Sequence, residues 1–204
     1  CGEYITAAYK LEVGHPPGAP LFMVLGRLFS FFAAPENVAV YINALSAISS
    51  SLTILFMFWS LTLFIKKIVL KQGDELTGAN QIAIFGAAAI GSLAYTFSDS
   101  FWFSAVEGEV YAMASLFTAV IFWAILKWDE EMEAIQHGSK LSELRPNRWL
   151  LLIFFMLGLA IGVHLLGILV VPAIGYMIYF RTQEEVSIKG LILTGIISIV
   201  ALGF

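Results

Sequence analysis

Long apolar stretches, separated by short polar breaks, make up most of this chain. A helix needs about 20 apolar residues to cross the hydrocarbon core of a bilayer, and fewer when it is short or untilted. Each stretch therefore predicts a membrane helix. The stretches are residues 38–65, 81–97, 110–126 and 149–180, and a last one that begins near residue 188. This pattern predicts an all-α fold, a polytopic transmembrane helix bundle.

The stretch 149–180 is too long for one crossing. At 1.5 Å per residue it would extend roughly 48 Å, against a hydrocarbon core of about 30 Å. Arg148 and Arg181 flank it, and equal charge at both ends favours a tight hairpin. We place the break near residues 162–164. Residues 38–204 then hold about six membrane helices, the last one truncated, and the chain is a single transmembrane domain.

The first 37 residues follow a different pattern. Residues 2–11 predict a short helix, and the run Gly14-His15-Pro16-Pro17-Gly18 stops it, because proline lacks an amide donor and fixes φ. Residues 20–32 predict an amphipathic helix, with Pro20 in its first turn and Arg27 on its polar side. Such helices often lie in the plane of the membrane interface.

Composition supports the membrane class and removes several functions. The chain is 59% hydrophobic and 13% charged, with a mean hydropathy of +0.86, whereas soluble domains carry roughly 25% charged residues. No basic patch interleaved with aromatic residues suggests nucleic acid. The single cysteine, Cys1, excludes an internal disulfide. The first residue is not methionine and the last ones are apolar, so we expect an internal piece of a longer protein.

Basic residues are divided unevenly between the two ends of the predicted helices. Only Lys10 and Arg27 fall on the side of the first 37 residues. The other nine of the eleven fall on the opposite side: Lys66, Lys67, Lys71, Lys127, Lys140, Arg145, Arg148, Arg181 and Lys189. The positive-inside bias places the richer side in the cytoplasm. We therefore expect residues 1–37 to be extracytoplasmic, and 127–148, with a charged loop over 129–147, to be cytoplasmic.

Ionisable groups gather at the predicted outer face, and charge held near hydrocarbon favours a functional role because it costs free energy. Glu3 could act as a general base towards a hydroxyl, or simply cap a helix start. His15 precedes two prolines that aim its ring, although a lone histidine is more often a structural hydrogen-bonding residue. We expect Glu3 and His15 to face one cavity with Glu109 and His164, because all four lie at one predicted depth. Four unrelated interfacial groups are the alternative.

Two glutamates lie at the outer junction of two predicted spans. Glu107 and Glu109 are two residues apart, so on a helix they would point to different faces, and at most one should share a cavity with Glu3. Glu109 would also gain from the helix dipole if it begins the next helix, which is the structural alternative. The sequence contains no nucleotide-binding loop, zinc signature or nucleophile elbow.

The opening string, CGEYITAAYKLEVGHPPGAPLF, is highly distinctive. Further motifs follow in order: Phe101-Trp102, then Glu109-Val110-Tyr111, then Gly158-Leu159 and Gly162-Val163-His164. Together they resemble a large polytopic membrane family that is common in Bacteroidetes and related to protein O-mannosyltransferases, including a vertebrate transmembrane O-mannosyltransferase. The family pattern opens with Asp-x-Gly-Glu and continues, after a short helix, with Gly-x-x-His-Pro-Pro-Gly-x-Pro-Leu. The family Asp would precede Cys1 and is absent from this chain.

The resemblance implies a GT-C glycosyltransferase whose first extracytoplasmic loop carries interfacial helices and an acidic residue. It implies inverting transfer of a mannose-like sugar from a polyprenyl-phosphate donor to a protein or glycan hydroxyl, at the periplasmic face of a bacterial inner membrane. Glu3 is the predicted catalytic base. The predicted substrate-binding residues are His15, Arg27, Glu107, Glu109, Tyr111 and His164. The sequence predicts no definite cofactor, and it leaves open whether the site binds a divalent cation.

Two other functions compete with the enzyme. A transporter or flippase for a polyprenyl-linked or other amphiphilic substrate should carry polar groups near the bilayer midplane, and often broken helices. Here the ionisable groups gather at one face, with only Asn43 and scattered serines deeper, which favours chemistry at the surface. A scaffold that only anchors a partner would leave the outward acids and His15 unexplained.

Overall fold

The structure, a computed structural model, describes residues 2–70, 74–139 and 144–203, and all regular secondary structure in them is helical. The predicted all-α class is confirmed. In chain order the elements are α1 (Gly2–Lys10), α2 (Pro20–Ser30), η1 (Pro35–Asn37), α3 (Val38–Val69), α4 (Gly78–Thr96), α5 (Asp99–Val106), α6 (Val110–Gln136), α7 (Asn147–Ile161), η2 (Leu165–Val170), α8 (Val171–Thr182) and α9 (Ile188–Ala201).

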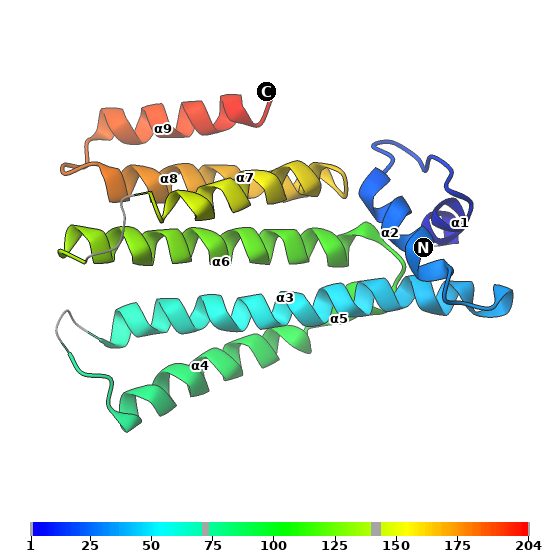
Figure 1. The fold of residues 1–204 in the computed structure, drawn as a ribbon, viewed down its shortest axis with the longest axis horizontal. Coiled ribbons are helices and arrows are strands. Elements are labelled where there is room, and N and C mark those ends of the chain that lie inside the picture. The colour runs from blue at the N-terminus through cyan, green and yellow to red at the C-terminus, as the bar shows by residue number, and fades with distance from the viewer. Residues whose placement is uncertain (1, 71–73, 140–143, 204) are drawn as a thin grey trace.

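The long helices lie roughly side by side, and α1 and α2 gather at one end of them (Figure 1). α3 packs against α4 and α6, α6 packs also against α7, and α9 packs on α8. Successive long helices run in opposite directions, so α3, α6 and α8 all end remote from α1 and α2 (Figure 1). The two sides that the charge pattern separates are therefore opposite ends of one bundle.

Three helical stretches are long and apolar enough to cross a membrane: residues 35–69, 110–136 and 165–182. α4 and α5 together form a fourth, bent by 66°. α7 and α9 are shorter apolar helices of 15 and 14 residues. By length and composition the described residues thus contain three or four spans, and the total of about six stays a prediction.

The hairpin and both N-terminal helices are where the sequence predicts them. α7 ends at Ile161 and η2 begins at Leu165, which confirms the break near residues 162–164. The predicted charged loop over 129–147 is wrong in its first part, because α6 continues to Gln136. The short helix α5 was not predicted.

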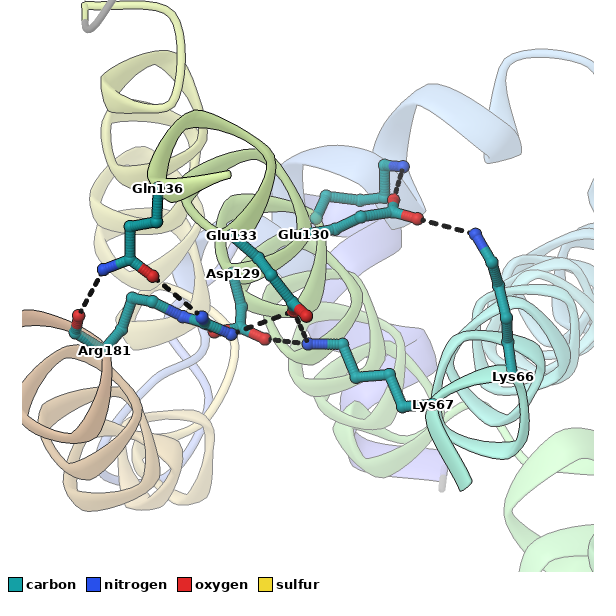
Figure 2. Close-up of polar contacts among 8 residues, drawn as sticks. Lys66, Lys67, Asp129, Glu130, Glu133, Gln136 and Arg181 are labelled. Atoms are coloured by element: carbon teal, nitrogen blue, oxygen red, sulfur yellow. Dashed lines mark hydrogen bonds and ion pairs between the residues drawn. The ribbon is translucent and has the colours of Figure 1, made fainter. Parts of the chain in front are cut away.

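Carboxylates on the last turns of α6 explain why that helix continues. Asp129 pairs with Lys67 of α3 and, at 2.5 Å, with Arg181 of α8. Glu133 pairs with the same two cations at 2.8 and 3.1 Å (Figure 2). These four residues, which we name the Asp129 cluster, join three helices. The two carboxylates can lie near the end of α6 because cations from α3 and α8 neutralise them.

α1 and α2 form a small layer on the N-terminal end of α3, and their core is shared with the start of α6. Ala8 and Phe22 are fully buried in it. Gly26 allows the two helices to approach closely, because a Cβ there would lie 2.8 Å from Ala8 Cβ. The Leu21 N–H donates to the Gly162 carbonyl at 2.8 Å. This bond ties the start of α2 to the hairpin break.

Candidate active site

A polar cavity of about 360 Å³ lies where α1, the hairpin break and the start of α6 meet. Four separate segments of the chain line it, with Glu3, Tyr4, His15, Pro16, Pro17, Glu107, Glu109, Tyr111 and His164. Six of the seven predicted site residues are among them, and Arg27 is not. The structure thus brings Glu3, His15, Glu109 and His164 to one cavity, as the sequence analysis expects.

Glu3 and His15 are joined directly, although they are 12 residues apart. Glu3 Oε1 accepts a hydrogen bond from the His15 backbone N–H at 2.8 Å, and His15 Nδ1 lies 2.9 Å from the same oxygen. The bond from the backbone N–H, followed by that from the ring, lowers the pKa of the Glu3 carboxyl. Glu3 is therefore ionised at neutral pH and holds the proline-rich turn over α1, which goes beyond capping a helix.

Tyr4 packs against the His15 ring of this pair. Its ring meets the His15 ring edge-on at a centroid distance of 5.3 Å and the Phe22 ring at 5.7 Å. Burial raises the pKa of Tyr4, with a further contribution from the Glu109 and Glu3 carboxylates. The hydroxyl therefore keeps its proton. Sequence reasoning missed Tyr4, because an aromatic residue in an apolar helix pattern is more often core than site.

Glu107 and Glu109 both line the cavity, so the expectation that at most one would do so is wrong. That expectation assumed a helix, where residues two apart diverge. The backbone is extended at both positions, with φ/ψ of −107°/140° at Glu107 and −134°/162° at Glu109. Between them the chain makes a tight turn at Gly108, in which the Glu109 backbone N–H donates to the Glu107 carbonyl at 2.9 Å, and both side chains reach the cavity. The Ser46 hydroxyl of α3 lies 3.5 Å from the Glu109 carbonyl.

His164 lies at the hairpin break and has the polar partner that its position requires. Its Nδ1 accepts the Leu166 backbone N–H at 3.1 Å, which caps η2. Its ring lies against that of Tyr111, in the first turn of α6, with centroids 5.4 Å apart. The hairpin therefore delivers an imidazole to the same cavity as Glu3 and His15.

Arg27 is engaged within the layer of α1 and α2 rather than in the cavity. Its guanidinium donates to the Tyr9 carbonyl at 2.6 Å, and lies 5.2 and 4.7 Å from the ring centroids of Tyr9 and Phe31. These contacts fasten α2 to the end of α1. The position of Arg27 gives no support to its predicted role in substrate binding.

An apolar groove of about 440 Å³ lies between α3, α4 and α6. Leu61 and Phe64 of α3 line it with Ala119 and Phe122 of α6. Tyr111 lines both this groove and the polar cavity, so one side chain joins the two spaces. The sequence analysis missed the groove because it exists only through the packing of three helices.

The cavity offers carboxylates, imidazoles and phenol groups. Ionised carboxylates only accept hydrogen bonds, whereas an imidazole can accept on one nitrogen and donate from the other. The described part of the chain contains no group of three or more His, Cys, Asp or Glu side chains that could hold a metal ion. The arrangement suits hydrogen bonding to a ligand rich in hydroxyl groups and removal of a proton from one of them.

Comparisons with known proteins agree with this picture. The family model described as Protein O-mannosyl-transferase TMEM260 N-terminal domain matches residues 1–187. Protein O-mannosyl-transferase tmem260 of Dictyostelium discoideum is 28% identical over 125 residues, which are 60% of this chain and 13% of that protein. Protein O-mannosyl-transferase TMEM260 of Mus musculus is 28% identical over 143 residues, 70% of this chain and 18% of that protein.

The chain thus spans less than a fifth of the length of these curated relatives. No solved structure matches it. The family match extends over all four segments that line the polar cavity. The chain belongs to the family of protein O-mannosyl-transferase TMEM260 N-terminal domains.

Proposed function

We propose that this chain is part of an integral-membrane glycosyltransferase that moves mannose from a polyprenyl-phosphate donor to a serine or threonine hydroxyl of an acceptor protein. The sugar and the protein acceptor follow the names of the relatives. One observation carries the proposal: an ionised carboxylate, Glu3, faces the same cavity as Glu109 and His164, at the end of a membrane bundle.

The reaction assigns one task to Glu3. The acceptor hydroxyl gives its proton to the carboxylate while its oxygen attacks the anomeric carbon. The bond from that carbon to the phosphate oxygen breaks, and polyprenyl phosphate leaves with the bonding electron pair. Attack from the face opposite the leaving group inverts the anomeric centre. The lowered pKa of Glu3 keeps the carboxylate ionised at neutral pH, which is the form that accepts a proton, but it also makes the carboxylate a weaker base, so its position beside the acceptor hydroxyl has to drive the transfer.

The remaining residues of the cavity bind and orient the sugar. Carboxylates such as Glu107 and Glu109 accept hydrogen bonds from sugar hydroxyls. His15 holds Glu3 through two hydrogen bonds and so fixes the direction from which the acceptor proton is taken. Tyr111 and His164, whose rings are in contact, form a further part of the cavity wall.

The apolar groove supports a donor with a lipid tail. A polyprenyl chain needs an apolar path beside the site that binds its phosphosugar, and the groove meets the polar cavity at Tyr111. Burying each CH₂ of such a chain contributes roughly 0.8 kcal/mol. The GT-C class and the assignment of the cavity to the extracytoplasmic, periplasmic side rest on the family resemblance and on the distribution of basic residues.

The transporter alternative gains no support from the helices. Hydroxyl groups deep in α3 donate to carbonyls of their own helix, Thr53 to Ser49 at 2.8 Å and Ser60 to Phe56 at 2.8 Å. Both side chains line the groove between α3, α4 and α6, but their donors are already bonded within the helix and most of the groove is apolar. Among the described residues, the one sharp bend in a candidate span lies between α4 and α5.

The test is Glu3→Gln in the full-length protein, assayed by transfer from a polyprenyl-phosphate sugar to a hydroxyl acceptor. Glutamine keeps the shape but cannot take the proton, so the rate should fall by about 10²–10⁴. Glu12→Gln is the matched control, because Glu12 lies in the same segment, pairs with Lys10 at 4.0 Å and does not line the cavity. Transfer at the parental rate by Glu3→Gln would remove Glu3 as the base.

A further inference from the structure

Gly108 lies at a close approach between the two halves of the candidate site. It stands between Glu107 and Glu109 and is buried. A Cβ added to it would lie 2.7 Å from Asn43 Oδ1 and 2.8 Å from Ile5 Cγ1, whereas ordinary van der Waals contact begins at 3.4 Å. Ile5 of α1 and Asn43 of α3 therefore both lie against the backbone at Gly108.

The need for glycine here is one of space and not of backbone conformation. The described glycines with positive φ are Gly18, Gly138 and Gly203, so Gly108 holds a φ that other residues also adopt. Asn43 Oδ1 is enclosed by protein, and an added methyl group cannot displace it into solvent. Relief would have to come from movement of α1 away from the loop.

We propose that Gly108 is a positioning residue, whose missing side chain sets the distance between Glu3 on α1 and the carboxylates of Glu107 and Glu109. Ile5 is two residues from Glu3 on the same helix, so a push on Ile5 also moves Glu3. The inference rests on the proposed function, because the distance matters only if these carboxylates act on one substrate. A displacement of about 1 Å in a catalytic site can lower a rate by about 100-fold.

The experiment compares Gly108→Ala with Gly86→Ala in the full-length protein. The residue-86 Cβ would meet nothing within 4 Å, in the middle of α4, so it controls for glycine replacement as such. We expect Gly108→Ala to lower kcat about 10- to 100-fold with a smaller change in KM. Gly86→Ala should leave both at the parental values. Equal kinetics for the two variants would overturn the proposal.

A rescue separates positioning from packing. The background Ile5→Ala/Asn43→Ala removes both atoms that the new Cβ would strike, so Gly108→Ala should change kcat in it by less than about twofold. If Gly108→Ala fails to fold alone, the triple variant should recover both folding and the transfer rate of its background. Recovery of folding without transfer would show that the loss of transfer does not come from this contact and would overturn the positioning role, and failure to recover either would refute the close approach.

A second readout needs no substrate. The same set of variants, followed by thermal unfolding, should show a lower midpoint for Gly108→Ala that disappears in the background lacking the Ile5 and Asn43 side chains. The coupling tests the close approach even if Glu3→Gln transfers sugar normally. Failure of the proposed function and failure of this inference therefore give different results. A midpoint loss that persists in the truncated background would overturn the contact.

Discussion

The Asp129 cluster makes a sharp prediction about stability. Asp129→Asn keeps the volume and the position of the side chain but removes the charge that Lys67 and Arg181 share (Figure 2). Glu133 then remains as the only acid of the cluster for two cations. Because α3 and α8 both reach α6 through this acid, the contacts of both helices should weaken.

The size of the effect follows from burial. The Asp129 side chain is 9% exposed, but Lys67 and Arg181 are 38% and 20% exposed, so water compensates part of the loss. Breaking a fully buried pair costs about 3–5 kcal/mol and an exposed one about 0.2–1 kcal/mol. We expect about 2–3 kcal/mol for this intermediate case. For a domain of this size that corresponds to a fall in Tm of roughly 5–10 °C.

The assay is thermal unfolding of the full-length protein in one detergent, followed by tryptophan fluorescence. The matched control is Glu130→Gln on the same helix turn, because Glu130 is 33% exposed and pairs with a half-exposed Lys66 and, within its own helix, with Lys127. That change should cost no more than about 1 kcal/mol. If the two variants shift the midpoint by the same amount, the reasoning from burial is wrong.

Three further predictions concern the site and its orientation. The lowered pKa of Glu3 means that its bonds to His15 stabilise the fold above the ordinary glutamate pKa and are lost as pH falls through the lower folded value. Hydrogen-exchange protection of the His15 amide should therefore be full at neutral pH, persist through the ordinary glutamate range at about pH 4.3 and be lost only below it; protection already lost above that range would contradict this. Ala119→Trp should fill the apolar groove and raise KM for a long-chain donor but not for a short-chain one; an equal rise for both would count against the groove. Single cysteines at Glu12 and Ser139 should react with an impermeant reagent from opposite sides, and labelling from one side would refute the topology.

The helices and the hairpin could be predicted from the sequence because each depends on a local pattern of residues. A long apolar stretch predicts a helix whatever surrounds it. The stretch between Arg148 and Arg181 is too long for one crossing, and the equal charge at its two ends indicates a hairpin. The structure has both features. The end of α6 was not predictable in this way. Asp129 and Glu133 are compensated by Lys67 and Arg181, 62 and 52 residues from Asp129, and no local pattern reveals such partners.

The sequence predicted most of the residues of the site but not how they are arranged. Glu3 and His15 stood out through a motif, and the cavity contains both. Glu107 and Glu109 were separated on the assumption of a helix, whereas the tight turn at Gly108 brings both to the cavity. Arg27 was assigned to the site for its charge alone, and its partners within α1 and α2 could be known only from the packing of those helices.

The hydrogen bonds of the two cavity histidines fix opposite tautomers. An ionised Glu3 only accepts, so the hydrogen of the neutral His15 ring sits on Nδ1 and leaves a lone pair on Nε2. In His164, Nδ1 accepts the Leu166 amide, so the hydrogen sits on Nε2. One imidazole therefore offers the cavity an acceptor and the other a donor, before any ligand enters. Glutamine at position 3 would preserve this asymmetry and remove only the charge, because its one carbonyl oxygen can still accept both the backbone and the ring bond from His15.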